Sequence, residues 1–258
     1  MDIIQSLILG VVQGVTEFLP ISSSGHLVLF QKLFGLKEPP IFFDTLIHFA
    51  TLLAIVFYLR KEIWSIVSGL NKKENQRLVG LIVLATIPAV ILGFLIKDKI
   101  EVIFNSLALL SITFFITAVI LFFTKFFGNG QKTLVNLGWF GSLFVGLFQA
   151  LAILPGVSRS GSTISAGLFM GLKREDAFRF SFLLAIPAIF GAMVLQIFDF
   201  NWNSLNGGFL VNFIGFLAAL IFGFLSLKIL EKITTKGKLH YFAYYCLVLG
   251  LITLIFIH

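Results

Sequence analysis

The apolar positions of this chain form runs of two lengths. Six runs extend over about 20 residues, which is the length a helix needs to cross a hydrocarbon core about 30 Å thick. They cover residues 41–59, 78–96, 103–123, 180–198, 209–227 and 241–257. We predict that each of these runs is a membrane-spanning helix.

Two further regions, 3–36 and 139–172, each contain two short apolar pieces separated by a polar break. In the first region Pro20 stops the helix, and the sequence I-S-S-S-G-H follows it. In the second region the break runs from Pro155 to Thr163 and reads P-G-V-S-R-S-G-S-T. No piece spans a bilayer alone, and two half-length helices that meet at a polar break predict a re-entrant hairpin.

The two halves of the chain repeat this pattern. Adding 136 to the residue number matches identical residues: Gly10 with Gly146, Gln13 with Gln149, Ser22 with Ser158, Ser24 with Ser160 and Gly25 with Gly161. A hairpin followed by three spans crosses the membrane an odd number of times, so the second half must be inverted. We therefore predict an all-α polytopic membrane protein, one integral domain made of two inverted-topology repeats, 1–136 and 137–258. Each repeat has one re-entrant helical hairpin and three transmembrane helices.

The basic residues orient this topology, because cytoplasmic loops carry an excess of lysine and arginine. The side of the N-terminus holds only Lys32, Lys37, Lys97 and Lys99. The opposite side holds Arg60, Lys61, Lys72, Lys73, Arg77, Lys125, Lys132, Lys173, Arg174, Arg179, Lys228, Lys232, Lys236 and Lys238. We expect the second set in the cytoplasm and both termini outside, so that the two hairpins enter from opposite faces and their tips meet near the midplane.

Composition excludes several classes of protein. The chain is 58% hydrophobic and 12% charged, against about 25% charged residues in soluble domains. The net charge of +7 does not indicate nucleic-acid binding, because the basic residues lie in short loops between apolar runs. A single cysteine, Cys246, excludes a disulfide framework.

The second break indicates an anion site. Arg159 is a charge at the centre of an apolar run with no carboxylate nearby in the sequence, and such a residue is by default functional. A helix capped by Ser158 would direct its free N–H groups and its positive dipole end at the break, and a guanidinium fits phosphate oxygens. We predict substrate binding by Gly156, Ser158, Ser160, Gly161, Ser162 and Thr163. The alternative is a Ser/Thr-rich kink with a snorkelling arginine.

The first break adds a carboxylate. Gln13 and Glu17 lie on one helical face, four positions apart. A buried Glu17 would repel a phosphate unless a divalent cation lay between them, and Mg²⁺ commonly binds one or two carboxylates together with substrate phosphates. We therefore predict that Glu17 binds a divalent cation, Mg²⁺ or Ca²⁺. The alternative is an ion pair between Glu17 and Arg159 that fixes the fold; both hold if the pair forms only when the site is empty.

The remaining polar residues of the first break supply the parts for phosphoryl transfer. His26 titrates near neutrality, and Ser23 lies three positions before it, within reach on a helix. We predict that Glu17, Ser23, His26 and Arg159 are catalytic, and that Gln13, Ser22, Ser24 and Gly25 help to bind substrate. The sequence leaves open whether Ser23 or His26 attacks phosphorus or either activates water. Asp44 and His48 share a face, and a role in the cavity or in the structure is equally open.

These motifs carry a resemblance. Q-G-V-T-E-F-L-P-I-S-S-S-G-H (13–26), F-D-T-L-I-H-F-A-T (43–51) and the 155–163 break resemble the undecaprenyl-diphosphate phosphatases, also called bacitracin-resistance proteins. The resemblance implies a multi-pass enzyme of the bacterial cytoplasmic membrane that removes the terminal phosphate of an isoprenoid diphosphate and recycles the lipid carrier of cell-wall synthesis. It also implies a divalent metal and roles for Glu17, Ser23, His26 and Arg159. Gln13 stands where some members have glutamate, which leaves the metal stoichiometry open.

Two other classes of function also fit parts of this sequence. A transporter or flippase of a phosphorylated lipid is the principal alternative, because inverted repeats are typical of transporters. A membrane scaffold would leave Glu17, His26 and Arg159 unexplained. The expected partner is an isoprenoid diphosphate lipid, with its tail between helices and its head group at the two breaks; no nucleic acid is expected, and a homodimer is left open.

Overall fold

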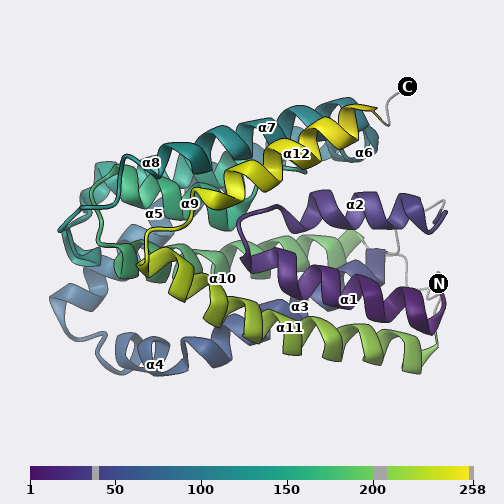
Figure 1. Cartoon of the computed structure of the whole chain (residues 1–258). Coiled ribbons are helices and arrows are strands. Elements are labelled where there is room, and N and C mark those ends of the chain that lie inside the picture. Colours follow the sequence, from purple (N-terminus) through teal and green to yellow (C-terminus); the bar gives the residue numbers. More distant parts are fainter. Residues whose placement is uncertain (37–40, 200–207, 256–258) are drawn as a thin grey trace.

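The computed structural model describes residues 1–36, 41–199 and 208–255, and its elements are helices (Figure 1). The first half contains α1 (Ile3–Phe18), α2 (Ser23–Leu33), α3 (Ile41–Tyr58), α4 (Arg60–Ser68), α5 (Lys73–Ile96), η1 (Lys97–Lys99), α6 (Ile100–Asn105) and α7 (Leu107–Phe123). The second half contains η2 (Leu134–Asn136), α8 (Gly138–Leu151), α9 (Arg159–Phe169), α10 (Arg174–Asp199), α11 (Phe209–Thr235) and α12 (Tyr241–Ile255). The all-helical prediction is confirmed.

The long apolar runs form helices, with some changes at their ends. Among the described residues, α3, α5, α10 and α11 are long and apolar enough to cross a membrane, as a multi-pass membrane protein requires. The span predicted at 103–123 is wrong at its start. Ser106 interrupts it and caps α7, because its side chain accepts from the backbone N–H of Leu109. The span predicted at 241–257 is described only as far as Ile255.

Both polar breaks lie between two short helices, as the sequence predicted. The first break separates α1 from α2, and the second separates α8 from α9. α2 and α9 have 11 residues each and begin with the same cap: Ser22 accepts from the N–H of Gly25, and Ser158 accepts from the N–H of Gly161. At about 1.5 Å per residue, each of these helices is about 16 Å long, roughly half of a bilayer core.

The helices pack in a pattern that pairs distant segments. α1 lies along α11, α8 along α5, and α7 along α12, while α3 packs against α10 and α11 (Figure 1). α2 packs on α1, and α9 packs on α8 and α10. The end of α1 is fixed in the core by Phe18, whose ring meets that of Phe182 at 5.6 Å in an edge-to-face contact. The first break is therefore anchored against α10 of the second half.

Small residues allow the closest of these contacts. A β-carbon added to Gly10 would lie 2.3 Å from the carbonyl oxygen of Gly215, so α1 and α11 touch through their backbones. Ser6 also donates a hydrogen bond to the carbonyl of Val211. Helices in lipid depend on such close packing and interhelical hydrogen bonds, because no hydrophobic driving force joins apolar faces within hydrocarbon.

We predict that Gly10→Ala destabilises the protein by about 1–3 kcal/mol, because the added methyl overpacks the α1–α11 contact. Thermal unfolding in detergent measures the effect. Gly80→Ala on α5 is the matched control: a β-carbon there meets no atom within 4 Å, and alanine is the better helix former. Equal melting temperatures for Gly10→Ala and the wild type would contradict this packing.

Candidate active site

The two breaks touch each other. The backbone N–H of Gly156 donates to Ser22 Oγ at 3.0 Å, so the cap of α2 also holds the tip of the second break. Ser22 has a φ of 69°, which is rare for a residue other than glycine, and Gly156 has a φ of 92°. A β-carbon on Gly156 would also lie 2.1 Å from Thr113 Oγ1. Glycine is therefore required at this position by both backbone conformation and space.

Helix α7 holds the second tip through two threonines that sequence analysis did not identify. Thr113 Oγ1 donates to the carbonyl of Pro155 at 2.5 Å, and Thr117 Oγ1 donates to the carbonyl of Gly156 at 2.8 Å. Thr117 Oγ1 also accepts from the N–H of Ser158 at 3.1 Å. These bonds satisfy backbone groups that the break removes from the helical ladder, and they fix the start of α9.

Glu17 lies where the two tips meet, and side chains from four helices surround its carboxylate. Arg159 Nη2 donates to Oε1 at 2.6 Å, and Ser23 Oγ donates to Oε2 at 2.5 Å. Gln13 Nε2 donates to Oε2 at 3.2 Å, and His48 Nε2 lies 3.9 Å from Oε2. Glu17 is 8% exposed, so these groups replace the water that a carboxylate would otherwise need. We call these five residues the Glu17 cage.

The first residue of each half-length helix, α2 and α9, donates one of the two shortest hydrogen bonds to the Glu17 carboxylate. Ser23 opens α2, and Arg159 opens α9. Two helix N-termini therefore bring positive potential to the same point, which stabilises an anion there. The ion pair between Arg159 and Glu17, which the sequence offered as the alternative to a cation at Glu17, is present in this structure.

The cage retains unused hydrogen-bonding capacity. Arg159 Nη1 and Gln13 Oε1 are buried without a hydrogen-bond partner in the described part of the chain. Unsatisfied buried polar atoms are rare in folded proteins, and they indicate a place where a ligand or ion can bind.

His26 does not join the cage. Within the described residues no hydrogen bond joins it to Ser23, and the predicted Ser23–His26 contact is wrong in this structure. Its Nδ1 lies 2.7 Å from the carbonyl oxygen of Ser22, and its Nε2 lies 2.7 Å from the hydroxyl of Tyr245 on α12. The reason is geometric: a helical side chain points back toward the N-terminus of its helix, so the ring reaches the capping carbonyl.

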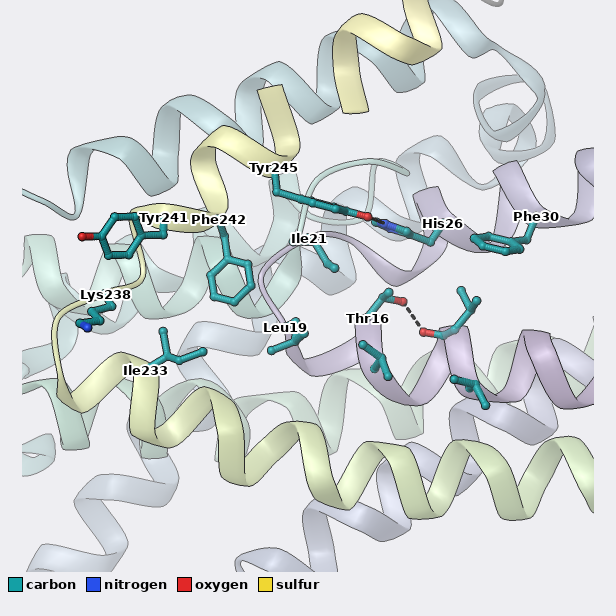
Figure 2. A pocket seen from close by; sticks show the side chains of 13 residues that line it. Thr16, Leu19, Ile21, His26, Phe30, Ile233, Lys238, Tyr241, Phe242 and Tyr245 are labelled. Carbon is teal, nitrogen blue, oxygen red and sulfur yellow. Dashed lines mark hydrogen bonds between the residues drawn. The ribbon is translucent and has the colours of Figure 1, made fainter. Parts of the chain in front are cut away.

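An apolar groove of about 700 Å³ lies beside His26, between the α1–α2 hairpin and α11–α12 (Figure 2). His26 and Tyr245 meet at one side of it, and Lys238 lies toward another end. Its α1 lining includes Val12, Val15 and Leu19, which lie on the helical face opposite to Glu17. The groove and the Glu17 cage are therefore separate features that share the α1–α2 hairpin.

Most hydroxyls predicted to bind substrate have protein partners here. Ser158 and Ser160 lie 3.2 Å apart through their Oγ atoms, and Thr163 Oγ1 donates to the carbonyl of Arg159 at 2.8 Å. Ser24 Oγ lies 3.3 Å from Ser22 Oγ. Ser162 Oγ is buried and unpartnered within the described residues, and the N–H of Gly161 is used by the cap of α9.

The structure separates two residues whose roles the sequence left open. Both carboxylate oxygens of Asp44 accept from Gln31 Nε2, at 3.0 and 2.9 Å, which ties α3 to α2. His48, one turn later on α3, faces Glu17 instead. The sequence signal for His48 was the shared face with Asp44, but only the packing of α3 against α1 shows which residue reaches the cage.

We predict that Arg159→Met destabilises the protein by about 3–5 kcal/mol, because it leaves a buried carboxylate without its strongest partner. Glu17→Gln combined with Arg159→Met should recover much of this loss, and denaturant unfolding of both single variants and the double variant measures the coupling. Arg179→Met is the control: its half-exposed contact with Glu62, at 3.7 Å, should contribute at most about 1 kcal/mol. Additive effects at Glu17 and Arg159 would contradict a coupled pair.

Comparisons with known proteins identify the family of this chain. Residues 6–252 match the family model described as bacitracin resistance protein BacA. A relative from Carboxydothermus hydrogenoformans is 46% identical over 258 residues, covering 99% of this chain and 97% of that protein. A relative from Methanosphaera stadtmanae is 42% identical over 273 residues, covering 99% and 98%. Both are named undecaprenyl-diphosphatase, as is one from Thermosipho africanus at 45% identity over 248 residues, covering 95% and 97%. The chain belongs to the bacitracin resistance protein BacA family.

Proposed function

We propose that this protein hydrolyses undecaprenyl diphosphate to undecaprenyl phosphate and inorganic phosphate, and so recycles the lipid carrier of cell-wall synthesis. The observation that carries the proposal is the Glu17 cage, in which a hydroxyl, a carboxylate and a guanidinium meet at two helix N-termini. The names of the relatives support the same activity and substrate.

The terminal phosphate would bind where the two helix N-termini converge. Arg159 has one unpartnered amino group, Nη1, and its guanidinium can present a planar fork to phosphate oxygens. Because an incoming phosphate competes with Glu17 for this guanidinium, binding would loosen the ion pair and free the carboxylate for proton transfer.

Glu17 is the group placed to accept the proton of the nucleophile. Ser23 Oγ already donates to Glu17 Oε2 at 2.5 Å. If Ser23 attacks, a bond forms between Oγ and the terminal phosphorus, the bond to the bridging oxygen breaks, undecaprenyl phosphate leaves, and water then hydrolyses the phosphoserine. If water attacks, Ser23 orients it and Glu17 takes its proton. Arg159 and the two helix ends stabilise the charge that develops on phosphorus oxygens.

His26 supports this centre from the next helical turn. It bonds the carbonyl of Ser22, the residue that caps α2 and also holds Gly156. We propose that His26 positions the start of α2, and with it Ser23, through this bond and through Tyr245.

The cage could hold a divalent cation if oxygen atoms of the substrate supplied the remaining ligands. Among the described residues no group of three or more His, Cys, Asp or Glu side chains could hold a metal ion by itself. Glu17 supplies a carboxylate, and Gln13 Oε1 is a buried oxygen without a partner. Mg²⁺ or Ca²⁺ would be held by Glu17 and Gln13 together with diphosphate oxygens, and when bound it would neutralise charge on the diphosphate.

We also propose the inverted repeat, 1–136 and 137–258, which matching contacts support. Ser6 bonds the carbonyl of Val211 on α11, and its counterpart Ser142 bonds the carbonyl of Leu81 on α5 at 2.5 Å. The backbone carbonyls at the two breaks are also contacted in matching ways, each by a helix of the other repeat. Cys246 Sγ on α12 lies 3.7 Å from the carbonyl of Pro20, and Thr117 on α7 bonds that of Gly156. The lengths of α2 and α9 support re-entrant hairpins, and the inverted repeat would have them enter from opposite faces.

The proposed orientation puts both termini on the external side of the cytoplasmic membrane. The N-terminus and the far end of α12 lie at one end of the molecule, while α4 and the turn between α11 and α12 lie at the other (Figure 1). Basic residues concentrate at the second end. Lys37, assigned to the outer side, lies outside the described residues.

The isoprenoid chain would lie between helices in lipid. The apolar groove of Figure 2 reaches His26 but lies on the face of α1 opposite to Glu17, so we do not assign the chain to it. A flippase of the same lipid is the second candidate, and the inverted repeat favours it. The two functions differ in whether phosphate is released.

We predict that the purified protein in detergent, given undecaprenyl diphosphate and Mg²⁺, releases inorganic phosphate. Ser23→Ala and Arg159→Ala should each lower the rate by about 10²-fold or more, because each removes a group that contacts the reacting phosphate. Ser68→Ala is the control: within the described part of the chain, its hydroxyl bonds only the carbonyl of Trp64 on α4. Movement of labelled lipid across vesicles without phosphate release would favour the flippase instead.

We predict that cysteines introduced at Lys72 and Lys236 react only with a reagent that reaches the cytoplasm, and that one at Asp2 reacts from outside. A Cys246→Ser background removes the native thiol, which is buried. Labelling of positions 2 and 72 from the same face would overturn the proposed topology.

A further inference from the structure

We propose that His48 is a further ligand of the divalent cation at Glu17, through its Nε2 atom, and that this nitrogen makes the site select Mn²⁺ over Mg²⁺ and Ca²⁺. The inference rests on the proposed diphosphatase for the presence of a cation. It adds a residue from α3 to a site that otherwise consists of Gln13 and Glu17 on α1.

The hydrogen bonds of His48 fix which of its nitrogens is available. Nδ1 lies 2.7 Å from the carbonyl oxygen of Asp44, one turn earlier on α3. A carbonyl only accepts, so Nδ1 carries the hydrogen and Nε2 has a free lone pair in the neutral ring. Histidines that bind metals usually donate their other N–H to a carbonyl or carboxylate in this way, which orients the ring.

The free lone pair points at a second acceptor. Nε2 lies 3.9 Å from Glu17 Oε2, which is too far for a hydrogen bond. A lone pair and a carboxylate at this distance repel each other, and either a proton on Nε2 or a bound cation would relieve the repulsion. A small approach of the two side chains would let Nε2 and Oε2 hold one cation between them.

Gln13 supplies an independent sign of a ligand. Its side chain is 0% exposed, yet Oε1 has no partner among the described residues. Its Nε2 bonds Glu17 and lies 3.4 Å from Thr51 Oγ1. Rotating the amide by half a turn would aim Oε1 at the space beside Glu17 and His48. In this structure the Nε2 side of the amide faces Glu17, and a cation in this space would give the rotated Oε1 a partner.

The resulting ligand set is a carboxylate, an amide oxygen and an imidazole nitrogen. Oxygen ligands suit Mg²⁺, Ca²⁺ and Mn²⁺, whereas imidazole favours transition metals. Mn²⁺ accepts both kinds and retains positions for diphosphate oxygens. Arg159 would leave Glu17 Oε1 as the cation arrives and would then pair with the phosphate.

The experiment measures coordination directly, apart from activity. Wild-type protein labelled with ¹⁵N-histidine is titrated with Mn²⁺ in detergent, with and without methylenediphosphonate, and pulsed electron paramagnetic resonance detects nitrogen bound to the metal. We expect a directly bound histidine nitrogen in the wild type. The signal should be lost in His48→Gln, with Mn²⁺ affinity lowered by about 10–100-fold and Mg²⁺ affinity changed much less.

His240→Gln is the matched control, because His240 lies in the turn just before α12, where its ring packs on Tyr241, and should leave both readings unchanged. A bound Mn²⁺ without histidine nitrogen, a nitrogen signal that persists in His48→Gln, or no Mn²⁺ binding at all would each overturn the inference. The wild-type isotope experiment is decisive even if the variant does not fold. If the protein releases phosphate with Mg²⁺ but no histidine nitrogen binds Mn²⁺, His48 is not a ligand and the proposed diphosphatase activity is retained. If a histidine nitrogen binds Mn²⁺ but no phosphate is released, His48 is a ligand and the proposed diphosphatase activity is refuted.

Discussion

The burial of one carboxylate determines how the centre of this molecule is built. Glu17 lies in the last turn of α1, in a place that water hardly reaches, so its charge must be balanced by protein groups. Ser23 and Arg159 supply that balance from the first residues of α2 and α9. These donors lie 6 and 142 residues from Glu17, so the carboxylate joins its own hairpin to the opposite one. Any arrangement that separated the two hairpins would leave both charges buried and unpaired, which is strongly unfavourable.

The surrounding helices make this meeting possible by satisfying the broken backbone. Thr113 and Thr117 take up the free carbonyls of the second tip, and Ser22 takes up the N–H of Gly156. Hydrocarbon offers no alternative partners, so irregular backbone at membrane depth persists only where protein surrounds it. These bonds offset the free energy lost when two helices are interrupted. The interruption leaves two helix N-termini that point at one anion, the Glu17 carboxylate.

The same pairing connects structure to function. Under the proposed function, Arg159 both balances Glu17 and binds phosphate, so the resting ion pair and the substrate complex would compete for it. A substrate that took the guanidinium would release a carboxylate beside a serine hydroxyl, which is the arrangement that proton removal from a nucleophile requires. A cation at Glu17 would favour the same exchange, since it replaces the charge that Arg159 withdraws. Binding and activation would then be one event.

The sequence by itself determined the helices, the two breaks and most members of the cage. These features follow from local properties: the length of an apolar run, a proline or a serine cap, and the four-residue spacing of Gln13 and Glu17. A charge inside an apolar run, such as Arg159, requires a partner whichever fold the chain adopts. Only the tertiary structure decided which partners meet. The sequence prediction paired Ser23 with His26, but Ser23 bonds Glu17 and His26 bonds Ser22 and Tyr245. Thr117, Tyr245 and His48 reach their places through the packing of α7, α12 and α3, and helical spacing says which face a side chain occupies but not which distant helix covers that face.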